Sequence, residues 1–572
     1  MFGRFFLFFS VLACCNAVSA KDLRPQPEIS TQPSLRVSSR LSTAVSEKDM
    51  VVTAHPEATK AARQILDRGG NAADALVAAQ LVLGLVEPQS SGLGGGAFLL
   101  YHNALTGKTH SFDGRETAPM SASPEMFWRE DGSLMAFYEI AHSGLSVGVP
   151  GVPKLLDVVH DRFGQQEWGG LFDYAISLAR NGFSVTPRLA AMVENERKRF
   201  SPFPVTQIYF QGVFVDRILE NAAYANTLEA YRDQGSDFFY HGAFAQEIVS
   251  VVKQHGGALR VEDFAKYEVK ERPTLCDTYR KKRVCSMNEP SSGGLTILMI
   301  LKMLERFDLS EGPTSENLHR IIEASRLAFA DRGQYMADND FVMTPNSMLL
   351  NDDYIQERSA LIGRTAFDEV SYGVVVGFDE RAVAPQGTFE EVGTSHISII
   401  DQWGNIASMT TTIESAFGSH IMVGGFLLNN ELTDFTFTKK DAPHVVANAI
   451  QGGKRPRSSM APTIVFNAEN TPLLVVGSAG GSRIISYVLQ RIIGIVDWDQ
   501  SLEGSMLTPH FLSRGGPVDV ELGSQYPLQA LIDLGHEVVE RDLNSGVTAI
   551  HIDNGVYVGV ADPRREGVAE GF

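Results

Sequence analysis

The stretch Gly393-Thr394-Ser395-His396-Ile397-Ser398-Ile399-Ile400-Asp401 decides how the rest of the chain is organised. Polar and apolar residues alternate over 395–400, which predicts a half-buried β-strand. A turn at 402–405 leads into a return strand at 406–413, which is rich in threonine and β-branched residues. This hairpin places Thr394 at the head of a strand, directly after a glycine.

The segment before this strand favours cleavage. Residues 371–392 are rich in Gly, Pro and acidic residues and lack periodicity, which predicts a long exposed loop. A cut between Gly393 and Thr394 would make Thr394 a new N-terminus. Its hydroxyl could then attack a carbonyl, with its own α-amine as the general base. The alternative from these residues alone is that Gly-Thr simply opens a strand.

Several motifs resemble, in content and order, the small-subunit signature of the γ-glutamyltranspeptidases. After Thr394-Ser395-His396, the chain carries Thr410-Thr411-Thr412-Ile413-Glu414, Phe417-Gly418, Leu428-Asn429-Asn430-Glu431-Leu432-Thr433-Asp434-Phe435, Lys454-Arg455-Pro456-Arg457-Ser458-Ser459-Met460-Ala461-Pro462-Thr463 and Gly477-Ser478-Ala479-Gly480-Gly481-Ser482-Arg483-Ile484. The resemblance extends over about 50–572 and includes 55–119 in the first part of the chain.

The resemblance implies the four-layer αββα sandwich of N-terminal nucleophile hydrolases. Strands at both ends of 394–572, with helices between and before them, suit a sheet sandwich flanked by helices. The resemblance also implies a precursor that cuts itself at Gly393–Thr394. Its large fragment, 21–393, and its small catalytic fragment, 394–572, would remain one folded heterodimer.

The same resemblance implies the reaction and its catalytic residues. Thr394 would take the γ-glutamyl group from glutathione or another γ-glutamyl compound and pass it to water, an amino acid or a dipeptide, without a cofactor. Thr412 would hydrogen-bond to the Thr394 hydroxyl. The backbone N–H groups of Gly480 and Gly481 would stabilise the oxyanion, and one such donor is typically worth about 3 kcal/mol.

A γ-glutamyl donor carries an α-carboxylate and an α-ammonium, and family position assigns residues to both. Arg115 can bind the carboxylate in bidentate fashion, with the hydroxyls of Ser458 and Ser459 as further donors. The residues expected to accept the ammonium are Glu414, Glu431 and Asp434. Because the family varies between amide and acid at two of these positions and both are acids here, we expect an unusually negative pocket.

Residues 1–20 have the features of a signal peptide. Arg4 precedes the apolar run 5–13, and Val18-Ser19-Ala20 has the small-residue pattern of a cleavage site. We therefore expect a periplasmic or secreted protein whose mature chain starts at Lys21. A lipidation site at Cys14 is the weaker alternative. The polar, Pro- and Ser-rich residues 21–48 predict a poorly ordered leader.

Only Cys276 and Cys285 remain after removal of such a signal peptide. They are symmetric about a predicted hairpin turn at Arg280-Lys281, so they could face each other across two strands. Export permits a disulfide, and two buried free thiols are the alternative.

The net charge and the motifs of the chain argue against several other classes of protein. The net charge of −19 argues against a general nucleic-acid-binding protein, and no segment after residue 20 is apolar and long enough to span a membrane. The 14 histidines form no metal-ligand motif, so we expect no metal site.

The Gly-rich run 90–96 lacks the ending of a phosphate loop, which favours a tight helix-to-strand turn. Ser146, within a G-x-S-x-G pattern, lacks the strand-turn-helix context of a hydrolase nucleophile.

Two alternatives to the transferase remain open from the sequence. One is an acylase of the same fold that cleaves glutaryl side chains. The other is a non-catalytic binding protein that has retained the fold.

Overall fold

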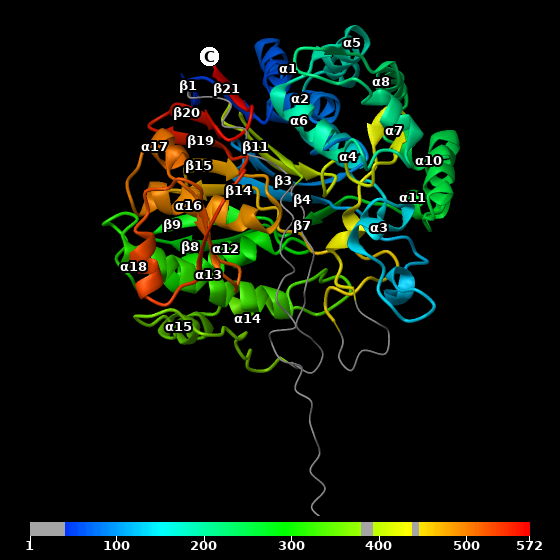
Figure 1. Cartoon of the computed structure of the whole chain (residues 1–572). Helices are drawn as coiled ribbons and strands as arrows, with labels where there is room; N and C mark the ends of the chain where they lie inside the picture. Colours follow the sequence, from blue (N-terminus) through cyan, green and yellow to red (C-terminus); the bar gives the residue numbers. More distant parts are fainter. Residues whose placement is uncertain (1–40, 379–392, 438–445) are drawn as a thin grey trace, which may run out of the picture.

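Two seven-stranded antiparallel sheets form the centre of the computed structural model, which describes residues 41–378, 393–437 and 446–572 (Figure 1). The first, called the β10 sheet here, has the order β21 (Val568–Gly571), β2 (Met50–Thr53), β10 (Ser395–Ile400), β11 (Ile406–Thr412), β3 (Gly96–Asn103), β4 (Lys108–Gly114) and β7 (Lys270–Arg272). The second, the β15 sheet, has the order β1 (Ser42–Ser46), β20 (Val556–Ala561), β19 (Thr548–Asp553), β15 (Pro472–Gly477), β14 (Thr463–Phe466), β9 (Lys282–Ser286) and β8 (Leu275–Tyr279).

The two sheets pack face to face through a shared apolar core. Because successive side chains of a strand point to opposite faces, each sheet contributes alternate residues to this core. The β10 sheet provides Met50, Val52, Leu100, Ile400 and Ile406, and the β15 sheet provides Cys285, Ile464, Phe466, Val475 and Ile550.

Helices cover the outer face of each sheet. Helices α1 (Pro56–Asp67), α2 (Ala72–Val86) and α4 (Val152–Phe163) share a core with the β10 sheet. Helices α12 (Gly293–Leu304), α13 (Ser315–Tyr335) and α16 (Ile484–Val496) belong to a core with the β15 sheet (Figure 1). The order helix, sheet, sheet, helix confirms the predicted αββα sandwich.

The remaining elements surround this sandwich. The other helices are α3 (Phe137–Ala141), α5 (Asp173–Asn181), α6 (Pro187–Glu196), α7 (Pro204–Tyr209), α8 (Ala222–Gln234), α9 (Asp237–Tyr240), α10 (Gly242–Gln254), α11 (Val261–Ala265), α14 (Asn346–Leu349), α15 (Asp352–Ala360), α17 (Leu502–Leu507) and α18 (Leu528–Asp533). Small sheets are formed by β5 (Phe183–Ser184) with β6 (Ile218–Leu219), by β12 (Met422–Val423) with β13 (Phe426–Leu427), and by β16 (Phe511–Leu512), β17 (Val518–Glu521) and β18 (Val538–Arg541).

Local sequence explains why α2 forms where it does. The Asn71 side chain accepts hydrogen bonds from the N–H groups of Ala73 and Asp74, and the Asp74 carboxylate accepts the Asn71 N–H, which completes a capping box. Every residue of the helix is buried, as a sequence that is apolar nearly all round predicts. Helix α2 thus begins directly after its cap, Asn71, and ends at Val86.

Two expectations about the chain are wrong. Strand β10 is buried on both faces, because α2 covers one face and the β15 sheet covers the other. Its polar side chains are satisfied inside the sandwich; the Ser398 hydroxyl, for example, donates to the Thr548 carbonyl at 3.2 Å. The end of the expected leader is ordered as well, since Ser42–Ser46 forms β1 and pairs with β20.

The expected cleavage point lies inside a single folded unit. Strand β10, which follows it, pairs with β2, and β11 pairs with β3, so residues before and after Gly393 share one sheet. The predicted signal peptide at 1–20 and the cleavage-loop residues 379–392 lie outside the described residues.

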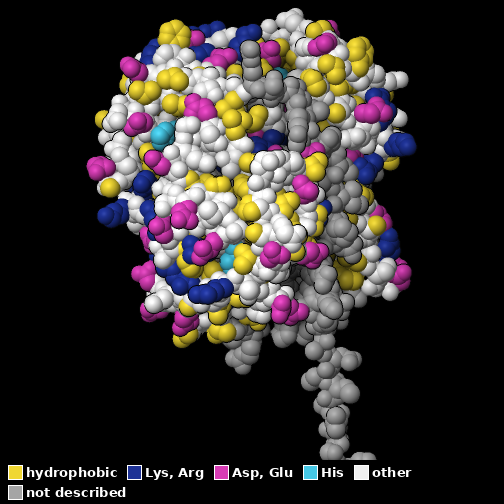
Figure 2. Space-filling view, turned by 60° about the vertical axis from the view of Figure 1, so that its left-hand side comes forward, with side chains coloured by type: hydrophobic (Ala, Val, Ile, Leu, Met, Phe, Trp, Pro, Cys, Tyr) yellow, Lys and Arg dark blue, Asp and Glu magenta, His cyan; other side chains and the backbone are white. Residues whose placement is uncertain are grey.

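The surface and the helices of the described part agree with the charge and hydropathy analysis. Acidic and basic side chains are interspersed on the face seen in Figure 2, which offers no extended basic area for a nucleic-acid backbone. Among the described helices, none combines the length and the apolar character that crossing a bilayer requires.

Candidate active site

Thr394 stands directly before β10 and is held there by three hydrogen bonds. Its N–H donates to the Ser90 carbonyl at 3.0 Å, and its own carbonyl accepts from Nη1 of Arg565 at 2.8 Å. Its hydroxyl donates to Oγ1 of Thr412 at 3.0 Å. The φ angle of Thr394 is +108°, a conformation that a β-branched residue adopts only under strain. The prediction that Thr394 stands at the head of a strand is confirmed, because β10 begins at Ser395.

Thr412 connects the nucleophile to the residues that follow β11. Its Oγ1 accepts the Thr394 hydroxyl and also the N–H of Glu414, the latter at 2.9 Å. The Glu414 carboxylate accepts the Ser415 hydroxyl at 2.9 Å. The predicted pair Thr394 and Thr412 is thus in direct contact, and Glu414 lies beside it.

The Gly-rich run after α2 supports the nucleophile from behind, a role that sequence patterns did not indicate. The Ser90 carbonyl accepts the N–H groups of both Thr394 and Ile413. A Cβ atom on Gly95 would lie 1.9 Å from the Thr412 carbonyl oxygen, so only glycine permits this approach. The expected tight packing turn is confirmed, and it packs against the site.

Gly480 and Gly481 lie between β15 and α16, where the chain turns back toward Thr394. Both have positive φ values, +131° and +57°. Among the backbone hydrogen bonds of the described residues, none uses either N–H. Gly481 lines the same pocket as Thr394, so its N–H is available to an oxyanion there.

Arg115, at the end of β4, is fully buried and contacts two of the predicted ammonium acceptors. Its guanidinium forms ion pairs with Glu431 and Asp434, which belong to the 3₁₀ turn Glu431–Asp434. It also donates to the carbonyls of Pro456 and Arg457, each at 3.2 Å. The expectation of an unusually negative pocket fits its lining, in which Glu414, Glu431 and Asp434 accompany one cation, Arg115.

Ser458 and Ser459 are fixed by the segment that leads into α12. The Ser458 N–H donates to the Pro290 carbonyl at 3.0 Å, and its carbonyl accepts the Ser292 N–H at 2.8 Å. The Ser459 hydroxyl accepts from Nη2 of Arg332 at 2.7 Å. Arg332 is a supporting residue that lies 127 positions away in the sequence, so no local pattern could have revealed it.

One pocket brings the predicted residues together. It is lined by Arg115, Thr394, Thr412, Glu414, Glu431, Asp434, Ser458, Ser459, Met460, Gly481, Ser482 and Ile484. The pocket is open to solvent, so a small molecule can reach Thr394 and Arg115 from outside.

A buried carboxyl pair stands behind Arg115. Burial raises the pKa of Glu431 to about 7; the Arg115 charge opposes this shift and the Asp434 charge adds to it. Burial and the Glu431 charge raise the pKa of Glu116 well above its usual range, and neither Glu116 oxygen has a hydrogen-bond partner that meets normal geometry. Burial beside Glu431 therefore favours the neutral form of Glu116, and no local sequence pattern indicated this carboxyl pair.

This arrangement predicts a pH dependence of substrate binding. Because its pKa is raised, Glu431 is protonated below about pH 7 and ionised above it. A cationic ammonium requires the ionised form, so kcat/KM for the donor should fall as the pH drops through about 7. In Glu431→Gln this step should disappear from the pH profile. An unchanged profile in that variant would refute the assignment.

Ser146 and the histidines show no sign of a second catalytic centre among the described residues. The Ser146 hydroxyl is buried and donates to the Ala141 carbonyl at 2.9 Å, which suits a structural role. Two groups of side chains have metal-ligand chemistry, His142 with Glu196 and His420, and His319 with Glu323 and His536. They come from distant segments, so motif spacing missed them. We assign no metal to either, and the absence of a metal site stays a prediction.

A threonine at the head of a central strand of an αββα sandwich, preceded by glycine and sharing its pocket with the Gly481 backbone, defines the class of N-terminal nucleophile hydrolases. The chain belongs to the γ-glutamyltranspeptidase family, since the family model described as Gamma-glutamyltranspeptidase matches residues 58–572.

Known proteins similar to this chain agree with that membership. It is 35% identical to a glutathione hydrolase proenzyme of Bacillus subtilis, with 92% of each chain covered. The structure of a cephalosporin acylase from Bacillus halodurans is 26% identical, with a TM-score of 0.82 over 94% of this chain and 98% of that one. The structure of Helicobacter pylori γ-glutamyltranspeptidase is 33% identical, with a TM-score of 0.55 over 57% of this chain and 95% of that one.

Proposed function

We propose that this chain is an exported precursor that cuts itself between Gly393 and Thr394 and then acts as a γ-glutamyltransferase and glutathione hydrolase. The observation that carries the proposal is the single pocket in which Thr394, the Gly481 backbone and the Arg115 ion pairs meet. These groups supply a nucleophile, an oxyanion donor and a recognition site for an amino-acid zwitterion.

Self-cleavage follows from the geometry around Thr394. The backbone of Thr394 is strained at φ while Gly393 is bonded to its nitrogen. Cleavage of the Gly393–Thr394 peptide bond releases this strain. Attack of the Thr394 hydroxyl on the Gly393 carbonyl breaks the C–N bond and forms an ester between Gly393 and the Thr394 side-chain oxygen. Water then hydrolyses this ester, which frees the Gly393 carboxylate and the Thr394 hydroxyl, and the released Thr394 amine is the general base for later turnovers. The fragments 21–393 and 394–572 remain together because they share both large sheets.

Donor recognition is an exchange of ion-pair partners. An incoming α-carboxylate takes the Arg115 guanidinium, and the α-ammonium of the same substrate takes Glu431 and Asp434. Because the donor zwitterion carries no net charge, the exchange leaves the total charge of the pocket unchanged and gives each new charge an opposite partner. The hydroxyls of Ser458 and Ser459 border the same pocket and add donors for the carboxylate.

The transfer itself uses groups already in place. The Thr394 hydroxyl attacks the γ-carbonyl, its proton passes to the Thr394 amine, and the oxyanion is held by the N–H groups of Gly480 and Gly481. The amine then protonates the leaving nitrogen. Water, an amino acid or a dipeptide attacks the γ-glutamyl ester in turn, and no cofactor takes part.

Export rests on the sequence of residues 1–20, which have the pattern of a signal peptide. A periplasmic or secreted location fits the disulfide between Cys276 and Cys285, because disulfides persist in oxidising compartments.

The acylase similarity gives the second candidate, and substrate choice separates the two. A glutaryl group lacks the ammonium, so its carboxylate would draw Arg115 away and leave Glu431 and Asp434 as unpaired acids. Sites built around a polar group can reject the analogue that lacks it by about 10⁴-fold.

The experiment compares kcat/KM for γ-glutamyl and glutaryl anilides under one condition, with and without a dipeptide acceptor. A large preference for the γ-glutamyl anilide and an increase in rate with the acceptor are expected. Similar values for the two anilides would favour the acylase, and no release from either would favour a non-catalytic protein.

A further inference from the structure

The hairpin of β8 and β9 carries a disulfide whose two cysteine residues differ in exposure. Cys276 and Cys285 are directly opposite in the strand register and are bonded to each other, as their symmetric spacing predicted. Cys285 is completely buried in the core between the sheets, whereas Cys276 is partly exposed at its edge. A molecule from solvent therefore approaches the disulfide from the side of Cys276.

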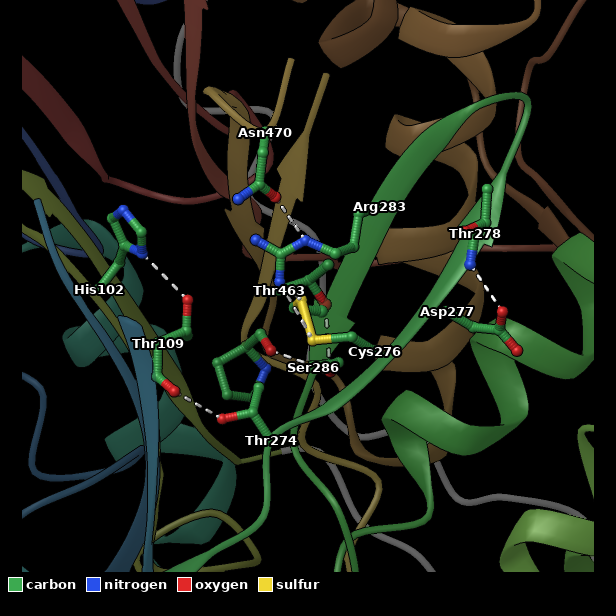
Figure 3. Close-up of a disulfide and its surroundings, with 12 residues drawn as sticks. His102, Thr109, Thr274, Cys276, Asp277, Thr278, Arg283, Ser286, Thr463 and Asn470 are labelled. Atoms are coloured by element: carbon green, nitrogen blue, oxygen red, sulfur yellow. Dashed lines mark hydrogen bonds between the residues drawn. A yellow bond between two sulfur atoms is a disulfide. The ribbon is translucent and has the colours of Figure 1, made fainter. Parts of the chain in front are cut away.

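Arg283 places a cation beside these sulfur atoms, as Figure 3 shows. Its Nη1 atom lies 3.0 Å from Sγ of Cys285 and 3.6 Å from Sγ of Cys276. The guanidinium is fixed by a 2.8 Å hydrogen bond from Nε to Asn470 and by stacking over the Phe466 ring, whose centroid is 4.0 Å away. The Arg283 guanidinium is thus held by Asn470, by the Phe466 ring and by its contact with the sulfur atoms.

The surroundings of Arg283 lack the usual counter-charge. Burial alone lowers its pKa, and no carboxylate among the described residues forms an ion pair with it. A disulfide is neutral and does not need a neighbouring cation. A thiolate does, because an adjacent guanidinium stabilises the negative sulfur. The site is therefore better matched to the reduced pair than to the oxidised one.

We propose that Cys276–Cys285 is an exchange site for low-molecular-weight thiols. The thiolate of the small molecule attacks Sγ of Cys276, the S–S bond breaks, and its electron pair moves to Sγ of Cys285, where Arg283 stabilises the leaving thiolate. A second small thiol attacks the sulfur of the first in the mixed disulfide and releases Cys276. Two thiols are oxidised to one small disulfide, and the protein pair is reduced to two thiols.

The sheet permits this reaction without unfolding. Cys285 lies in β9, which is paired with β8 on one side and β14 on the other, so both strands stay hydrogen-bonded when the S–S bond opens. The catalytic pocket contains neither cysteine. The exchange is therefore independent of the proposed transferase activity, and a thiol without a γ-glutamyl group tests it separately.

The test uses the full-length folded protein and 2-mercaptoethanol, with acid quenching, alkylation and mass analysis of the Cys276 and Cys285 peptides over time. Arg283→Gln should slow reduction by about tenfold, because the leaving thiolate loses its cation. Arg283→Lys should keep most of the wild-type rate. Lys281→Gln removes one positive charge from the same hairpin without a contact to either sulfur, and it should react like the wild type.

The direction of the effect separates this role from a structural one. A variant that merely loosens the hairpin would expose the disulfide and be reduced faster. Equal rates for wild type and Arg283→Gln, a faster Arg283→Gln, or a wild-type disulfide that resists the thiol until the protein unfolds would each overturn the proposal.

Discussion

Thr394→Ala should yield one uncut chain with no measurable γ-glutamyl transfer. The substitution removes the hydroxyl that attacks the Gly393 carbonyl, and without that cut the Thr394 amine, the general base, never forms. A loss of at least about 10⁴-fold in turnover is expected, since removal of a nucleophile typically has an effect of this size. Gel electrophoresis and intact-mass analysis should show two fragments for the wild type, the second beginning at Thr394, and one chain for the variant.

Thr411→Val is the matched control for this experiment. Thr411 is a buried neighbour of Thr412 on β11, and its hydroxyl has no hydrogen-bond partner among the described residues. The control should cut itself and turn over substrate normally. Efficient cleavage of Thr394→Ala at the same bond would contradict self-cleavage by this residue.

Arg115→Lys should lower kcat/KM for the γ-glutamyl donor by about 100-fold while leaving self-cleavage nearly intact. Lysine keeps the charge but loses the planar fork that reaches Glu431, Asp434 and the carbonyls of Pro456 and Arg457 together. Self-cleavage uses the chain's own carbonyl and needs no bound α-carboxylate. The two effects are measured by steady-state kinetics on the donor and by the rate at which fragments appear.

Arg358→Lys tests whether such a loss is specific to the pocket. Arg358 is also buried and contacts both carboxylate oxygens of its partner, Asp331, but it does not line the active-site pocket. Its replacement should leave the donor kcat/KM close to that of the wild type. A wild-type kcat/KM in Arg115→Lys would remove Arg115 from substrate recognition.

The parts of the fold that depend on local sequence were predictable. Helix α2 follows from a capping box at Asn71 and an apolar run, and the β10 hairpin follows from alternation and a Gly-containing turn. The resemblance then assigned the residues of the pocket, because Thr394, Thr412 and Glu431 lie in continuous motifs that keep their order.

Features set by tertiary contacts were not predictable in this way. The burial of both faces of β10 depends on the second sheet. Strand β1 forms by pairing with β20, which follows it by 500 or more residues in the sequence. The ion pair between Arg115 and Glu431 joins residues 316 positions apart. Arg565, which binds the Thr394 carbonyl, is 171 positions away from it. No periodicity or spacing encodes such neighbours.

The central claim is that Thr394 carries the γ-glutamyl group during turnover. The most direct measurement mixes the processed enzyme with an excess of γ-glutamyl anilide without an acceptor, quenches with acid in the pre-steady state, and maps the adduct by mass spectrometry of peptides. We predict one γ-glutamyl group on the peptide that begins at Thr394. An adduct on any other residue, or continued turnover with that peptide unmodified, would contradict the account.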